Sequence, residues 1–76
     1  MKVNKLDLHG ISHYQINSHV DSFIWNCMKG NKSTGEIITG NSERMKNLVI
    51  EIIKDYNIEY QVGDIYNHGY IKIILK

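Results

Sequence analysis

The stretch Leu6-Asp7-Leu8-His9-Gly10 determines how the rest of this chain is interpreted. In an extended strand successive side chains point to opposite faces, so Leu6 and Leu8 share one face while Asp7 and His9 share the other. The two leucines can therefore enter a core while a carboxylate and an imidazole stand side by side outside it. Gly10 then suits a turn. The stretch predicts the end of a strand that carries two titratable groups.

The composition indicates one small domain over residues 1–76. Of the 76 residues 42% are hydrophobic and none is proline, which argues against disorder. The formal net charge of +1 is too balanced for a non-specific nucleic-acid binder, so affinity for nucleic acid must come from a local cluster of positive groups. The single cysteine, Cys27, is expected in the core. Without a signal peptide or an apolar run of membrane-spanning length, we expect a cytoplasmic protein with no membrane partner.

Hydrophobic periodicity predicts four strands and two helices. In chain order these are a strand at 3–9, a helix from 12 to 30, a strand at 36–39, a helix from 42 to 56, and strands at 58–62 and 70–75. Ser12 followed by Gln15 has the spacing of a capping box, and Gly30 is expected to end the first helix in the left-handed conformation. Asn41 or Ser42 is expected to cap the second helix.

The order βαβαββ predicts an α/β fold. Two strand–helix–strand crossovers imply that the first three strands run parallel, and the last two strands form a hairpin. Right-handed crossovers in the same direction place both helices on one face of the sheet. The expected architecture is a two-layer sandwich, with a four-stranded mixed sheet covered by two helices.

This topology collects polar residues at one edge of the sheet. Ligands of parallel sheets bind outside the carboxyl ends of the strands. That edge would gather His9-Gly10, Thr39-Gly40-Asn41, the hairpin turn with His68, and the amino ends of both helices, which favour anions. Arg44 and Lys46 would add positive charge, unless they only form a solvated helix face. Phosphate is the natural ligand for such an edge.

Two motifs resemble those of the small MutS-related (Smr) domain family. The first is Leu6-Asp7-Leu8-His9-Gly10, which matches the family's LDLH motif. The second is Ile37-Ile38-Thr39-Gly40, which matches the opening of its TGxG motif. The resemblance extends from about Val3 to Leu75, with Ser42 standing where the motif has its last glycine. It implies the βαβαββ fold and nucleic-acid binding. In many family members it also implies endonuclease activity on DNA or RNA.

The resemblance makes Asp7 and His9 the candidate catalytic residues. Histidine titrates near neutral pH, so His9 suits general acid or base work, and Asp7 could orient it, accept a proton or bind a divalent metal. The backbone from Gly40 to Ser42, with Arg44 or Lys46, would hold the phosphate. The alternative without a catalytic role is that Asp7 only caps the local turn and that His9 is an exposed polar residue at the end of the strand. A further alternative is a metal site built from Asp7, His9 and His68.

Other functions stay open at this point. The domain could bind nucleic acid without cutting it, or could serve as a protein-interaction or dimerisation domain through an edge strand or Trp25. Tyr14 and Tyr66 could stack on unpaired bases. The choice between DNA and RNA, the metal, the oligomeric state and the contribution of a larger protein partner are not determined by the sequence.

Overall fold

The computed structural model describes residues 4–64 and 66–75. Its elements are, in order, strand β1 (Lys5–Asp7), a 3₁₀ turn η1 (His13–Gln15), helix α1 (Ile16–Lys29), strand β2 (Thr34–Ile38), helix α2 (Glu43–Asp55), strand β3 (Glu59–Val62) and strand β4 (Tyr70–Ile74). The predicted order of strands and helices is therefore confirmed. The expected strand 3–9 is shorter in the structure, and its residue Val3 lies outside the described residues.

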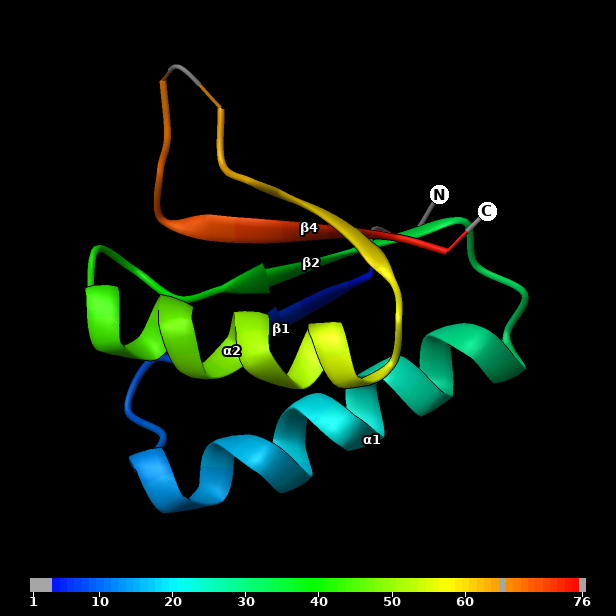
Figure 1. The fold of residues 1–76 in the computed structure, drawn as a ribbon, viewed down its shortest axis with the longest axis horizontal. Coiled ribbons are helices and arrows are strands. Elements are labelled where there is room, and N and C mark those ends of the chain that lie inside the picture. The colour runs from blue at the N-terminus through cyan, green and yellow to red at the C-terminus, as the bar shows by residue number, and fades with distance from the viewer. Residues whose placement is uncertain (1–3, 65, 76) are drawn as a thin grey trace.

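The four strands form one mixed sheet in the order β1-β2-β4-β3. β1 and β2 are parallel, and β4 is antiparallel to both of its neighbours, so β3 runs in the direction of β1 and β2. Both helices cover the same face of this sheet (Figure 1). The two-layer α/β sandwich predicted from the sequence is confirmed.

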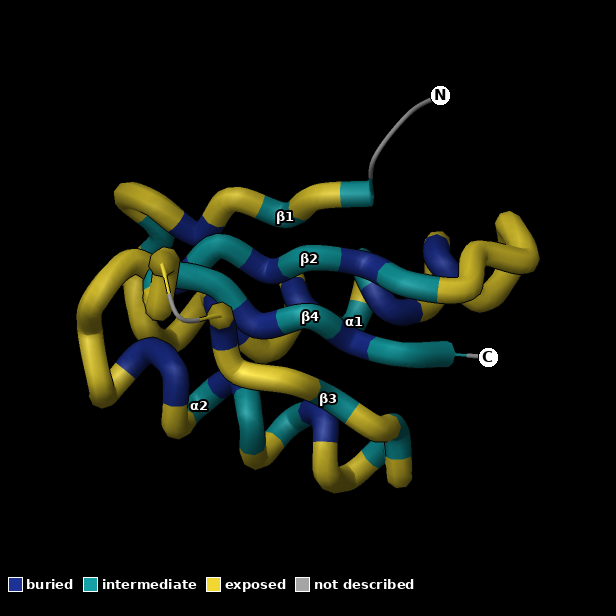
Figure 2. Tube along the Cα trace, turned by 90° about the horizontal axis from the view of Figure 1, so that it is seen from above, coloured by how far each residue is buried: buried dark blue, intermediate teal, exposed yellow. Residues whose placement is uncertain are grey.

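The core lies between the sheet and the two helices. The central strands pair Ile37 with Ile71, and both side chains are fully buried. From the helices, Val20 and Ile24 of α1 and Val49 of α2 reach the same cluster. Figure 2 shows this burial along the middle strands, while β3 at one edge is mostly exposed. Because a small domain has a small core, each of these side chains carries a large share of the stability.

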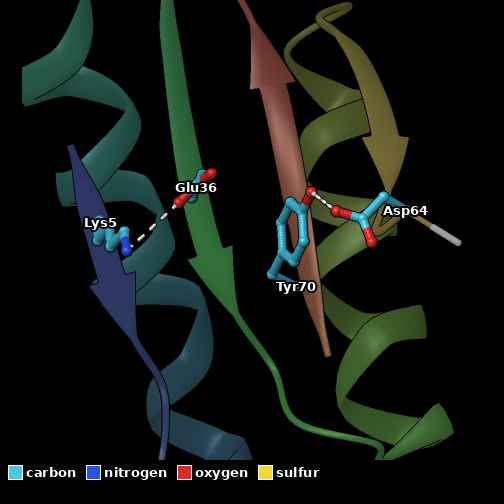
Figure 3. A network of polar contacts seen from close by, with 4 residues as sticks. All are labelled: Lys5, Glu36, Asp64 and Tyr70. Atoms are coloured by element: carbon cyan, nitrogen blue, oxygen red, sulfur yellow. Dashed lines mark hydrogen bonds and ion pairs between the residues drawn. The ribbon is translucent and has the colours of Figure 1, made fainter. Parts of the chain in front are cut away.

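The opposite face of the sheet is open and carries polar contacts. Lys5 Nζ lies 3.8 Å from a carboxylate oxygen of Glu36, its partner across β1 and β2 (Figure 3). At the other side of this face the Tyr70 hydroxyl donates to Asp64, with the oxygen atoms 3.1 Å apart (Figure 3). The Lys5–Glu36 pair is partly exposed to solvent, so it contributes little to stability.

Two expected helix ends are wrong. The Ser12 side chain caps nothing, because η1 precedes α1, and only the Ser12 carbonyl accepts a hydrogen bond, from the Gln15 N–H. At the other end of α1, Gly30 has a φ of −84° and the left-handed position falls on Asn31, with a φ of 56°. Asparagine tolerates this conformation, so the chain turns one residue later than glycine alone would suggest.

Candidate nucleic-acid interface

The turn after β1 is held by the carboxylate of Asp7. An oxygen of this carboxylate accepts a hydrogen bond from the backbone N–H of His9 at 2.9 Å. Gly10 follows with a φ of +79°, and no atom lies within 4 Å of the position that a Cβ would take there. Asp7 and His9 are both exposed, whereas Leu8 is buried as predicted. Asp7 therefore caps the turn that presents His9 and Gly10 to solvent.

The loop after β2 is joined to the β3–β4 hairpin. The carbonyl of Gly69 accepts hydrogen bonds from the N–H groups of Thr39 and Gly40, both at 2.9 Å. The buried Thr39 hydroxyl lies 3.0 Å from the Gly40 carbonyl oxygen and 3.4 Å from that of Gly69. Gly40 itself has a φ of +68° with open space at its Cβ position. Thr39 thus holds the loop together internally, and Gly40 leaves its backbone accessible.

Helix α2 begins beside this loop. The Ser42 hydroxyl accepts a hydrogen bond from the Met45 N–H at 3.1 Å. Of the two residues expected to cap this helix, Asn41 and Ser42, the structure therefore confirms Ser42. Within the described part of the chain, no hydrogen bond uses the N–H groups of Glu43 and Arg44. These groups and the exposed Arg44 side chain offer positive charge at the helix amino end.

Lys46 is buried in the structure. Its residue is only 7% exposed, so the alternative of a solvated helix face is wrong for Lys46 while it fits Arg44. Lys46 lines a cavity of about 520 Å³ together with His68 and Asn41. Sequence reasoning identified these three residues but missed Asn47, which lines the same cavity one residue after Lys46. The position of Asn47 directly after Lys46 on the helix is the signal that could have identified it as a residue of this cavity.

The β3–β4 hairpin depends on Asp64, which sequence reasoning also missed. One oxygen of its carboxylate accepts hydrogen bonds from the N–H groups of Asn67 at 2.7 Å and Tyr66 at 2.8 Å. These bonds lower the pKa of the Asp64 carboxyl below its ordinary value, helped by the Tyr70 hydroxyl and the charge of His68. The same contact with Asp64 raises the pKa of Tyr70. Gly63-Asp64 ahead of Asn67-His68-Gly69 is a turn signature that could have been read from the sequence.

We expect the hairpin to loosen in acid through Asp64. Because the folded pKa lies below the ordinary value of 3.8, the contribution of Asp64 is complete above that pH and is lost as the pH falls through the folded pKa. The amide proton shifts of Tyr66 and Asn67, followed by NMR against pH, should change with a midpoint below 3.8. In Asp64→Asn this transition should disappear. A midpoint at or above 3.8 in the wild type would contradict the prediction.

The structure divides the predicted site into two halves. His9 and Gly10 follow β1 at one edge of the sheet, whereas Lys46 and His68 lie on the side of β4 and β3. The loop from Gly40 to Ser42 stands between them. With strands spaced about 4.8 Å apart, β1 and β4 are separated by about 10 Å. Within residues 4–64 and 66–75, no three His, Cys, Asp or Glu side chains are grouped to hold a metal, so the Asp7, His9 and His68 site is not formed.

Several aromatic side chains are free for contacts with a ligand. Tyr66 is 91% exposed in the hairpin beside His68, and Tyr14 is 85% exposed near the start of α1. Trp25 is 59% exposed on α1, away from the core. Cys27 is buried as expected, and this burial raises the pKa of its thiol. Tyr66 is therefore the aromatic residue best placed to join the His68 half of the site.

No family model matches this chain, and neither do any of the curated proteins or solved structures compared with it. Among the residues described, no helix is long and apolar enough to cross a membrane. Any functional assignment must therefore rest on the residues and their geometry.

Proposed function

We propose that this chain is an Smr-like domain that binds nucleic acid and cleaves phosphodiester bonds in DNA or RNA. The observation that carries the proposal is the gathering of polar groups at one end of the sheet. Three connecting segments lie at this end of the sheet (Figure 1): the turn at His9-Gly10 after β1, the loop from Gly40 to Ser42 after β2, and the hairpin with His68 between β3 and β4. The amino end of α2 lies at the same place.

The geometry of the two glycine turns supports close approach of a phosphate backbone. Gly10 and Gly40 both adopt positive φ, and at both positions the space for a side chain is empty. The free N–H groups of Glu43 and Arg44 and the Arg44 guanidinium would bind phosphate oxygens. These groups also suit the developing charge of a phosphoryl-transfer reaction.

His9 is the residue we propose for proton transfer. It is exposed directly after β1, and the Asp7 carboxylate fixes the backbone from which its ring projects. A histidine in this position could deprotonate the attacking hydroxyl or water, or protonate the leaving oxygen. Asp7 serves this role as a positioning residue, since its carboxylate accepts a hydrogen bond from the His9 backbone.

Cleavage assays with structured RNA and supercoiled DNA test this function. His9→Ala should lower the cleavage rate by about 100-fold or more, the usual contribution of a general acid or base. His19→Ala serves as the control, because His19 is an exposed histidine on α1 outside the site. Assays with and without added Mg²⁺ determine the metal requirement. Absence of cleavage by the wild type, or equal rates for His9→Ala and wild type, would refute the nuclease assignment.

A binding module without nuclease activity is the second candidate. It is favoured by Ser42, which stands at the last glycine position of the TGxG motif and uses its hydroxyl to cap α2. Binding should then weaken with salt, with a slope of about −0.9 per duplex phosphate contacted. Arg44→Ala should reduce this slope by about one unit. Binding without cleavage would support this candidate over the first.

A further inference from the structure

A groove lies between the start of α1 and the middle and end of α2, and it shares no lining residue with the candidate nucleic-acid interface. The two helices lie side by side on one face of the sheet (Figure 1). The groove has a volume of about 410 Å³. The side chains that give this interhelix groove its chemistry are Tyr14, Ile16, Leu48, Glu51, Ile52 and Asp55.

The interhelix groove has an apolar lining contributed by both helices. Ile16 of α1 is buried, whereas Leu48 and Ile52 of α2 are half-buried. Ile52 packs against the core cluster, but Leu48 is not among the described side chains that do so. Leu48 therefore leaves apolar surface in the groove that an apolar side chain of a partner can cover.

Two carboxylates stand beside this apolar lining. Glu51 and Asp55 are exposed and lie four residues apart on α2, a spacing at which like charges repel each other and destabilise a helix. Within the described residues neither carboxylate makes an ion pair or accepts a hydrogen bond, and no Lys or Arg is among the described residues that line the groove. A cation bound here would relieve the repulsion, whereas a phosphate backbone would be repelled.

The walls of the interhelix groove are joined in the free protein. The Tyr56 hydroxyl of α2 donates a hydrogen bond to the Asp21 carboxylate of α1, with the oxygen atoms 2.9 Å apart. A site whose walls are already fixed loses little conformational freedom when a ligand binds. Tyr14 adds an aromatic ring that is 85% exposed, and a guanidinium can stack on such a ring.

We infer that the interhelix groove binds a segment of a partner protein that carries an arginine beside apolar residues. The guanidinium lies between Glu51 and Asp55, where its several N–H donors suit two carboxylates. The neighbouring apolar side chains of the segment cover Leu48 and Ile52. The inference does not depend on the proposed function, because it concerns a different surface and a ligand of opposite charge.

Isothermal titration with three short synthetic peptides tests the inference. The first alternates leucine with arginine, the second has glutamate in place of arginine, and the third has alanine in place of leucine. The first peptide should bind most tightly. The double variant Glu51→Gln/Asp55→Asn should weaken its binding about tenfold, as expected for the loss of two exposed ion pairs. Leu48→Ala should weaken it about fivefold through lost apolar burial.

Glu43→Gln is the matched control, because Glu43 is an exposed carboxylate on the same helix outside the groove. It should bind the first peptide as the wild type does, and thermal unfolding should show that all variants fold. Absence of binding, equal weakening by Glu43→Gln, or equal affinity for the alanine–arginine peptide would overturn the inference. Sedimentation of the protein alone provides a further check. Self-association that Leu48→Ala abolishes would assign the groove to a second copy of this chain and overturn the inference.

Discussion

Ile37→Ala should lower the free energy of unfolding by about 3 kcal/mol, within the range measured for truncation of buried isoleucines. Ile37 is fully buried on β2, at the centre of the sheet, and pairs with Ile71 of β4. Its side chain faces the helices, so the substitution leaves a cavity that no neighbouring strand can fill. In a domain of this size the midpoint of thermal unfolding should fall by more than about 10 °C, followed by circular dichroism.

Ile38→Ala is the matched control for this prediction. Ile38 is the next residue of the same strand, but it lies on the open face of the sheet and is only half-buried. Its truncation should cost about 1 kcal/mol, typical of a partly exposed position. Similar losses for the two variants would show that the helices do not cover the face assigned to Ile37.

Gly63→Ala should lower the free energy of unfolding by at least about 2 kcal/mol, because backbone strain and a steric clash add together. Gly63 has a φ of +59°, which alanine adopts only at a cost. An added Cβ would lie 2.5 Å from the Asn67 carbonyl oxygen and 2.8 Å from the Cα of His68. Both are backbone atoms that cannot turn aside, so the hairpin must move. Urea unfolding of the two proteins measures the difference.

Gly40→Ala separates the contribution of backbone strain from that of the steric clash. Gly40 has a similar φ of +68° but nothing within 4 Å of its Cβ position, so this variant carries the strain without the clash. We expect a loss of about 1 kcal/mol. If Gly40→Ala and Gly63→Ala destabilise the domain equally, close packing at the hairpin contributes nothing.

Much of the fold follows from patterns that are local in the sequence. The alternation at Ile71 and Ile73 predicts a strand with one buried face, and both residues are fully buried. The polar run between Gly40 and Glu43 predicts a capped helix start, which the Ser42 hydroxyl provides. Such features depend on side-chain period and on backbone groups a few residues apart, so they can be read without tertiary contacts.

The ends of α1 and the burial of Lys46 could not be read in this way. The expected capping box at Ser12 is absent because the chain enters α1 through a 3₁₀ turn, so that Gln15 and not Ser12 stands at the N-cap of α1. Met45 of α2 belongs to the core cluster, and the next residue, Lys46, lines a cavity with Val62 and His68 of the β3–β4 hairpin. Whether a lysine faces solvent or a neighbouring element depends on that neighbour.

The sequence by itself determined the α/β class, the parallel run of the first three strands and the placement of Leu8, because hydrophobic period and crossover handedness act within short segments. Only the tertiary structure decided what surrounds the polar residues of Leu6-Asp7-Leu8-His9-Gly10 and of the loop after β2. In the structure the Asp7 carboxylate accepts a hydrogen bond from the His9 N–H, and the Gly69 carbonyl accepts hydrogen bonds from Thr39 and Gly40. Lys46 lines the same cavity as His68. The Asp7 bond is local to its turn. The contacts of Gly69 and His68 join segments far apart in the chain, and their geometry exists only once the sheet has formed.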